Sequence, residues 1–266
     1  MRAYRVAYDG RPFHGFQRQP DVRTVEGALF DALDALGVTD GGPPPGYAAA
    51  GRTDAGVSAV AQTVAFAAPD WCSPAALGSE LPGAVRPWAA AEAPDGFHAT
   101  HDAVARTYVY YLHAPPDRTD DGRVAAALDR LSGEHDFHNL TPDDRGTVRD
   151  LAADCDREGE FLVVRATAGG FPRQLVRRLV GLLAEVGAGA DPGRIDRVLG
   201  PDPLDGPAGV APAPAEPLVL ADVAYPDLSF AADGAAVEGA RSAFRERRTR
   251  ALGAARVAGR VLDGLG

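Results

Sequence analysis

The stretch Ala50-Gly-Arg-Thr-Asp-Ala-Gly-Val-Ser58 decides how this chain is interpreted, because it sets an arginine and an aspartate two residues apart in one loop. Gly51 and Gly56 bracket the loop, and glycine permits positive φ angles and a close approach to a ligand. Hydrogen bonds donated by nearby backbone amides to Asp54 and its threonine neighbour would hold a carboxylate rigidly. The alternative is a polar turn in which Asp54 caps a backbone amide and Arg52 is solvated.

Strands and helices alternate on both sides of this loop. Residues 4–8 and 61–66 have the alternating pattern of half-buried strands, so the loop lies in a strand–loop–strand setting. Apolar residues recur at helical spacing over residues 24–36, with Thr24 placed as the N-cap and Gly37 as the stop. The other predicted elements are helices at 73–81, 122–131, 172–187 and 191–199, strands near 85–91 and 218–224, a hairpin of 149–156 and 161–167 turning at 157–159, and loops at 40–46 and 201–217.

Two successive β-α-β-β-α-β-like halves predict an α+β fold of two ferredoxin-like (RRM-like) subdomains. Their antiparallel sheets would join into one core, with helices on one side and an active-site cleft between the halves. We expect an N-terminal subdomain at residues 1–102 that carries the Asp54 loop, a second at 103–226 that completes the site, and an Arg-rich extension at 227–266.

The charge of the chain is unusual, because 37 acidic residues against 27 basic ones give a net charge of −10 and every basic residue is arginine. Such an acidic balance resembles that of proteins that work in concentrated salt. The exception is the tail from Arg241 to Gly266, where seven arginines face Glu246 and Asp263. Its local net charge of +5 leaves −15 on the rest of the chain. The tail is either an RNA-binding helix or a solvated helix, and the sequence leaves both open.

Folding is therefore expected to depend on high KCl, because repulsion among the acidic side chains is unscreened in dilute buffer. Circular dichroism during thermal unfolding at increasing KCl tests this expectation. Full stability in dilute buffer would contradict it.

Several classes of protein are excluded or disfavoured. No apolar run approaches the ~20 residues of a membrane span, and the N-terminus enters a strand-like pattern without a signal-type region, so we expect a cytoplasmic protein without membrane contact. Cys72 and Cys155 are the only cysteines, and the six histidines show no metal-ligand spacing, so neither a disulfide framework nor a metal site is expected. A P-loop is excluded because the chain has no lysine.

Four segments combine polar groups with rigid framing, which suggests that they share one cleft: 52–54, 106–110, 133–140 and 171–181. Spacing alone offers a less specific interpretation of two of their residues. Arg177 falls outside the apolar arc of its helix, which favours a solvated side chain. Tyr108 lies in a β-favouring run, where a tyrosine is more often part of the core.

The ordered motifs of the chain resemble those of the TruA family of tRNA pseudouridine synthases, and the resemblance extends from about residue 4 to 225. They are Tyr8-Asp-Gly10, Gly15-Phe-Gln-Arg-Gln19, Gly51-Arg-Thr-Asp-Ala-Gly-Val57, Leu81-Pro82, Phe97-His-Ala99, Ala105-Arg-Thr-Tyr-Val-Tyr110, Gly133-Glu-His-Asp-Phe137 and the segment from Phe171 to Gly181. Phe16, Ser58, Thr100 and the pair Glu216-Pro217 depart from the common family pattern, so the choice of uridine stays open. With the acidic composition, the resemblance predicts a halophilic archaeon as the source.

The resemblance implies a catalytic role for four residues. Asp54 would be the catalytic aspartate, and Arg177 the arginine that pairs with it. Arg52 would help displace the target nucleotide, and Tyr108 would be the active-site tyrosine. Substrate contacts are expected from Gly51, Thr53, Phe16, Gln17, Arg18, Tyr110, His98 and Phe137.

The resemblance also implies the reaction, in which uridines of the tRNA anticodon arm, around positions 38–40, are isomerised by a homodimer without cofactor or metal. The uracil N1–C1′ bond breaks, the base turns, and C5 joins C1′, so no group is lost. An ionised carboxylate starts this either by adding to the uracil ring or by abstracting a sugar proton to give a glycal, and the sequence leaves both routes open. Two other functions also remain open: a catalytically silent tRNA-binding or tRNA-folding protein, and a carboxylate hydrolase of nucleosides or glycosides.

Overall fold

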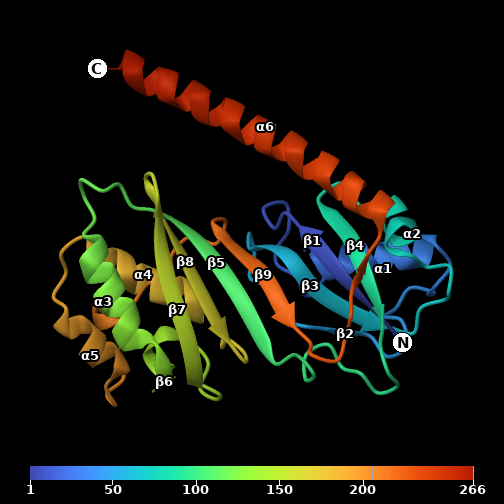
Figure 1. Ribbon diagram of the computed structural model, residues 1–266, viewed down its shortest axis with the longest axis horizontal. Coiled ribbons are helices and arrows are strands. Elements are labelled where there is room, and N and C mark those ends of the chain that lie inside the picture. Colours follow the sequence, from blue (N-terminus) through green and yellow to red (C-terminus); the bar gives the residue numbers. More distant parts are fainter. Residues whose placement is uncertain (205, 266) are drawn as a thin grey trace.

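The computed structural model describes residues 1–204 and 206–265, and it confirms a mixed α+β fold built on one large sheet. Within these residues ten strands form the sheet in the order β10-β4-β1-β3-β9-β5-β8-β7-β6, with β2 paired to β3. All pairings are antiparallel except that of β3 with β9. Figure 1 shows α1 and α2 at one end of the sheet and α3, α4 and α5 gathered at the other.

The strands are β1 (Arg2–Tyr8), β2 (Ala48–Ala49), β3 (Ser58–Phe66), β4 (Val85–Glu92), β5 (Ala105–His113), β6 (Gly133–Asp136), β7 (Val148–Glu158), β8 (Phe161–Ala168), β9 (Leu218–Ala224) and β10 (Ala231–Ala232). The helices are α1 (Val25–Ala35), α2 (Pro74–Ser79), α3 (Asp121–Leu131), α4 (Leu175–Gly187), α5 (Gly193–Leu199) and α6 (Gly234–Gly264), with short 3-10 helices η1 (His138–Leu140) and η2 (Gly206–Ala208).

The predicted elements are confirmed, although several boundaries differ. The strand predicted from residue 61 begins at Ser58, and the helices predicted at 73–81 and 191–199 span Pro74–Ser79 and Gly193–Leu199. The helix predicted from residue 172 begins at Leu175, because Gln174 has a left-handed φ of 63° and cannot continue a helix. The hairpin between β7 and β8 turns at Gly159 and residue 160 rather than at 157–159, since Glu158 pairs directly with Phe161. Gly159 takes a φ of 61°, which two-residue hairpin turns favour.

The apolar core consists of two clusters that meet along the middle of the sheet. One lies around β1 and α1, and the other around α3 and α4. Leu220 and Val223 of β9 belong to the first cluster although they come late in the chain, and the partly buried Tyr108 packs against both clusters. The two halves are therefore joined by β9 and β5 at the centre of the sheet. The division of the chain at residue 102 stays a prediction.

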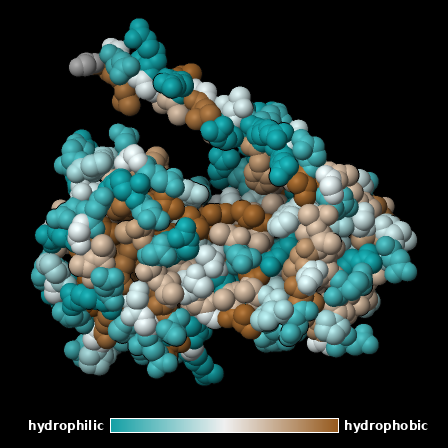
Figure 2. Space-filling model, viewed as in Figure 1, coloured by the Kyte–Doolittle hydropathy of each residue, from teal (hydrophilic) through white to brown (hydrophobic). Residues whose placement is uncertain are grey.

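The Arg-rich tail is part of α6, a helix of 31 residues that begins at Gly234. Its first half lies beside α2 and β4, and its second half runs above the half of the sheet that carries β5, β7 and β8 in the view of Figure 1. In the space-filling view the free end of α6 stands clear of the body (Figure 2). None of the described helices, including α6, is long and apolar enough to cross a membrane.

The loop that carries Asp54 packs directly on the end of β1. Gly10 follows β1, and a Cβ at this position would lie 2.0 Å from the carbonyl oxygen of Val57. The Gly10 amide also donates a hydrogen bond to Ser58 Oγ at 3.1 Å. A side chain at residue 10 would therefore push the β1 end and the Asp54 loop apart.

We expect Gly10→Ala to destabilise the protein by about 3 kcal/mol, because backbone atoms must move to relieve this overlap. Thermal unfolding in concentrated KCl should show a midpoint lower by roughly 9 °C. The matched control is Gly42→Ala, where an added Cβ meets nothing within 4 Å. Equal midpoints for the two variants would contradict the close packing of Gly10 on the loop.

Candidate active site

A cavity of about 1140 Å³ lies between the two halves, and the Asp54 loop forms part of its wall. Residues 14–17 and helix α1 contribute on one side, and residues 171–177 on the other. Tyr108 of β5 lies on the wall between them. Three of the four segments expected to share a cleft therefore do so. Residues 133–140 do not line this cavity.

Asp54 is held by an arginine from the opposite half of the molecule. Arg177 Nη1 of α4 donates to Asp54 Oδ2 at 2.9 Å, and the two side chains are 16% and 29% exposed. Among the described residues, the Asp54 carboxylate receives a hydrogen bond from Arg177 and from no backbone amide. The alternatives of a solvated Arg177 and of an amide-capping Asp54 are therefore wrong. The pair leaves the carboxylate aimed and open to the cavity.

Arg177 is fixed in turn by the loop between α5 and β9. Its Nε donates to the Ala213 carbonyl at 2.8 Å, and its own carbonyl accepts the Ala213 amide at 2.9 Å. The neighbouring Arg178 donates to the Val210 carbonyl at 2.6 Å. These contacts hold the Arg177 side chain in one rotamer that faces Asp54. Pairing with Asp54 therefore costs little additional side-chain entropy.

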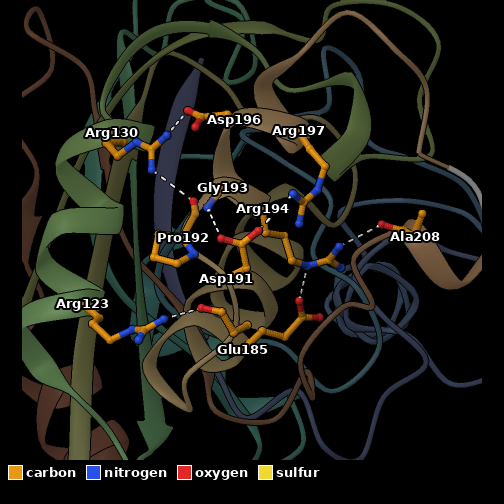
Figure 3. Close-up of polar contacts among 11 residues, drawn as sticks. Arg123, Arg130, Glu185, Asp191, Pro192, Gly193, Arg194, Asp196, Arg197 and Ala208 are labelled. Atoms are coloured by element: carbon orange, nitrogen blue, oxygen red, sulfur yellow. Dashed lines mark hydrogen bonds and ion pairs between the residues drawn. The ribbon is translucent and has the colours of Figure 1, made fainter.

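Other arginines hold the loop between α5 and β9 at residues 208 and 209 and fix the helices around it (Figure 3). Arg194 of α5 donates to the Ala208 carbonyl at 3.1 Å and to the Gly209 carbonyl at 2.9 Å, and it pairs with Glu185 of α4. Arg130 of α3 pairs with Asp196 of α5. These contacts tie α3, α4 and α5 to the segment that orients Arg177.

The backbone of the Asp54 loop is held from the N-terminal half. The Phe16 amide donates to the Thr53 carbonyl at 3.0 Å, and the Tyr8 hydroxyl lies 2.8 Å from Thr53 Oγ1. Gly56 takes a φ of 85°, as the loop prediction requires. Gly51 has no positive φ, and a Cβ there would meet nothing within 4 Å, so of its two expected roles the positive φ is wrong and the close approach to a ligand stays a prediction. Gly51 instead leaves open space on the cavity wall.

Tyr108 and Phe171 form an aromatic corner beside the carboxylate. Their rings meet edge to face at 5.2 Å between centroids, and both residues line the cavity. Burial raises the pKa of Tyr108 to about 12, an effect opposed by the charge of Arg106 and increased by that of Asp54. The phenol is therefore neutral at physiological pH and remains a hydrogen-bond donor.

Arg106 connects three loops around the site. It lies in the predicted segment 106–110, but the sequence assigned it no role of its own. Its guanidinium donates to the carbonyls of Ala50 at 2.8 Å, Thr100 at 2.6 Å and Gly169 at 2.5 Å. Burial lowers the pKa of Arg106 from its usual value. The available signal was a charged residue at the start of a strongly apolar and aromatic strand, where a cation needs acceptors.

The structure brings nine of the twelve predicted site residues to the cavity: Phe16, Gln17, Gly51, Arg52, Thr53, Asp54, His98, Tyr108 and Arg177. The side chain of Arg52 is exposed there. The groups that meet are a carboxylate, arginines, amides and aromatic rings. Within the described chain, no group of three or more His, Cys, Asp or Glu residues is placed to hold a metal ion.

Three predicted substrate contacts lie elsewhere. Phe137 is fully buried in the α3–α4 core, and Tyr110 is buried with its hydroxyl bonded to the Pro214 carbonyl at 3.0 Å. Their proposed contact with substrate is wrong at this cavity, because their side chains are covered by protein. Arg18 lies outside the cavity wall, with its guanidinium 5.8 Å from the centre of the Phe30 ring.

The chain is similar in sequence to known proteins and in backbone structure to a solved complex. A family model described as tRNA pseudouridine synthase matches residues 127–226. The tRNA pseudouridine synthase A of Haloarcula marismortui is 60% identical over 100% of both chains, and that of Halobacterium salinarum is 61% identical over 98% of both. A solved archaeal box H/ACA sRNP Nop10-Cbf5 complex matches 70% of this chain and 44% of its own chain, at 14% identity and a TM-score of 0.34.

Proposed function

Because this chain belongs to the TruA family of tRNA pseudouridine synthases and is an isomerase, we propose that it converts uridines of the tRNA anticodon arm, around positions 38–40, with Asp54 as the catalytic group. The observation that carries the proposal is the Asp54–Arg177 pair at 2.9 Å on the wall of a large cavity. A single ionised carboxylate suffices for this reaction, since no group is lost and no electron is transferred.

We propose that Asp54 acts on a uridine withdrawn from its stack. The cavity is large enough for a nucleotide, and binding pockets for small molecules have a comparable volume. In either route the N1–C1′ bond breaks and a C5–C1′ bond forms. The carboxylate adds to the uracil ring in one route and takes a sugar proton in the other. Arg177 keeps the carboxylate aimed in both routes.

The proposed roles of Arg52 and Tyr108 follow from their positions. Arg52 extends from the loop two residues before Asp54, and its exposed cation is available to RNA phosphates and to the space left by the target base. Tyr108 and Phe171 offer ring surfaces and a neutral phenol beside the carboxylate, which suits a displaced base. We also propose, on the family resemblance, that the enzyme works as a homodimer.

The direct test uses purified protein and unmodified tRNA transcripts in concentrated KCl. Carbodiimide adduct mapping should find pseudouridine at uridines of the anticodon arm and nowhere else in the transcript. Pseudouridine only at other positions would contradict the assigned arm. Binding of tRNA without any product would favour the silent tRNA-binding protein, and release of free uracil would favour a hydrolase.

A further inference from the structure

Helix α6 is anchored rigidly at its base. Asp233 caps it through the Ala236 amide at 3.0 Å and also accepts the Ala75 amide of α2 at 3.2 Å. Further along, Arg247 donates to the buried Asp9 carboxylate at 2.8 Å. The base of α6 therefore cannot swing freely, and its direction beyond Arg247 is set by the body of the protein.

The two sides of α6 differ in composition. Apolar residues recur along one side at intervals of three and four, with one gap of seven at Arg247 and Arg248: Val237, Ala240, Phe244, Ala251, Ala255, Ala258 and Leu262. Ala240 is buried and Phe244 is half-buried, whereas the residues from Ala251 onward are exposed. The apolar side therefore faces the body along the first half of the helix, and the opposite side faces away from the body.

Four arginines lie off the apolar side of the helix: Arg241, Arg245, Arg256 and Arg260. All four are exposed, whereas Arg248 borders the body beside Phe244 and Ala251. The four extend over about 28 Å at the rise of an α-helix. Arg245 pairs with Glu238, and no carboxylate of residues 1–204 or 206–265 lies within ion-pair distance of the other three. This row of cations is therefore available to an external anion.

The electrostatic contrast indicates what this surface binds. The segment from Arg241 to Gly266 carries a net charge of +5, and the rest of the chain carries −15. A merely solvated helix on such a chain would be acidic like the rest of the surface, since carboxylates keep a protein soluble. A row of cations on an anionic enzyme complements a polyanion, and the substrate of the proposed function is a polyanion.

We infer that the arginine face of α6 binds the phosphate backbone of tRNA outside the arm that enters the cavity. This inference rests on the proposed function for the identity of the RNA. No residue of α6 lines the cavity. The exposed part from Ala251 to Gly264 extends for about 21 Å. The RNA that α6 reaches is therefore different from the nucleotides beside Asp54.

A second copy of the chain is the competing partner for α6. The free half of α6 exposes five large apolar side chains, Leu252, Val257, Val261, Leu262 and Leu265, but their spacing spreads them around the helix. The side that continues the buried face is alanine until Leu262, so it offers a neighbour little continuous apolar area. Two tails of charge +5 would also repel each other. Both facts favour RNA over self-association.

The test removes two free cations, in the variant Arg256→Gln/Arg260→Gln. The control Arg118→Gln/Arg165→Gln also removes two exposed charges, which lie on the body. Filter binding gives the Kd for full-length tRNA and for an isolated anticodon stem-loop at several KCl concentrations, all within the range in which circular dichroism shows the protein folded. The α6 variant should bind tRNA roughly 10-fold more weakly at the lowest salt, with the slope of log Kd against log[KCl] reduced by about 1.5 to 2. Its affinity for the stem-loop and its kcat should be unchanged.

Equal tRNA affinity and equal salt slope for the α6 variant and the control would overturn the inference. If Leu262→Gln/Leu265→Gln lowers the sedimenting mass while Arg256→Gln/Arg260→Gln leaves the Kd unchanged, α6 serves self-association instead. The result is separable from the proposed function, because the Kd is measured without turnover. An α6-dependent Kd in a protein that makes no pseudouridine would support the RNA contact and refute the proposed chemistry.

Discussion

Asp54→Asn is expected to lower the rate of pseudouridine formation by at least about 10³-fold. The amide has the size of the carboxylate and still accepts a hydrogen bond from Arg177, so the cavity should keep its shape. It has lost the negative charge that both routes need, whether for addition to the ring or for removal of a sugar proton. Single-turnover assays with saturating enzyme measure the chemical step apart from tRNA binding and product release.

The Kd for tRNA separates lost chemistry from lost folding. Asp54→Asn should bind tRNA at least as tightly as the unaltered protein, because the substitution removes a negative charge that faces a polyanion. The control Asp154→Asn removes an exposed carboxylate that pairs with Arg165 in the neighbouring strand. Formation of pseudouridine by Asp54→Asn at the unaltered rate would rule out the proposed role of Asp54.

Arg177→Met is expected to reduce the single-turnover rate by about 10²-fold, with a smaller effect on the Kd for tRNA. Methionine has a similar length and fills the apolar part of the space, but it leaves Asp54 without its cation. A carboxylate that is no longer aimed spends less time in a reactive geometry. Arg177→Lys should recover only part of the rate, because an ammonium cannot contact Asp54 and the Ala213 carbonyl in the geometry of a guanidinium.

Arg178→Met is the matched control on the same helix. Arg178 also holds the loop between α5 and β9, through the Val210 carbonyl, but it does not line the cavity that contains Asp54. Both substitutions remove a partly buried guanidinium, so their effects on thermal stability should be similar. If Arg178→Met lowers the rate as much as Arg177→Met, the loss comes from the loop and not from the pairing with Asp54.

The sequence predicted the elements because their signals are local. Thr24 caps α1 through the Gly27 amide at 3.1 Å, as its position before an apolar periodicity indicates. The β7–β8 hairpin and the buried face of α4 were also visible in short windows. The boundaries that differed depended on single backbone angles, such as the φ of 63° at Gln174, which side-chain type alone does not predict.

The roles of candidate site residues could not be predicted from local sequence where those roles depend on contacts between distant parts of the chain. Spacing favoured a solvated Arg177, and the pairing with Asp54 came from the family resemblance, because the residues are 123 positions apart in the sequence. Phe137 and Tyr110 belong to the motifs that resemble the family, but their side chains are buried in the core. Arg106 shows the opposite case. Its four carbonyl partners, in Ala50, Thr100, Ala103 and Gly169, come from three separate loops, and no local pattern predicts their convergence.

The pairing of β3 with β9 has a consequence for the order in which this enzyme is assembled. Ser58 and Ala59 pair with Val219 and Leu220, so the centre of the sheet closes only after most of the chain has been synthesised. Contacts between such distant residues form late and slowly. A nascent chain that ends before β9 contains both Asp54 and Arg177 but lacks the strand that fixes their halves together. Catalytic competence therefore arises near the end of translation, and truncated products should be inactive.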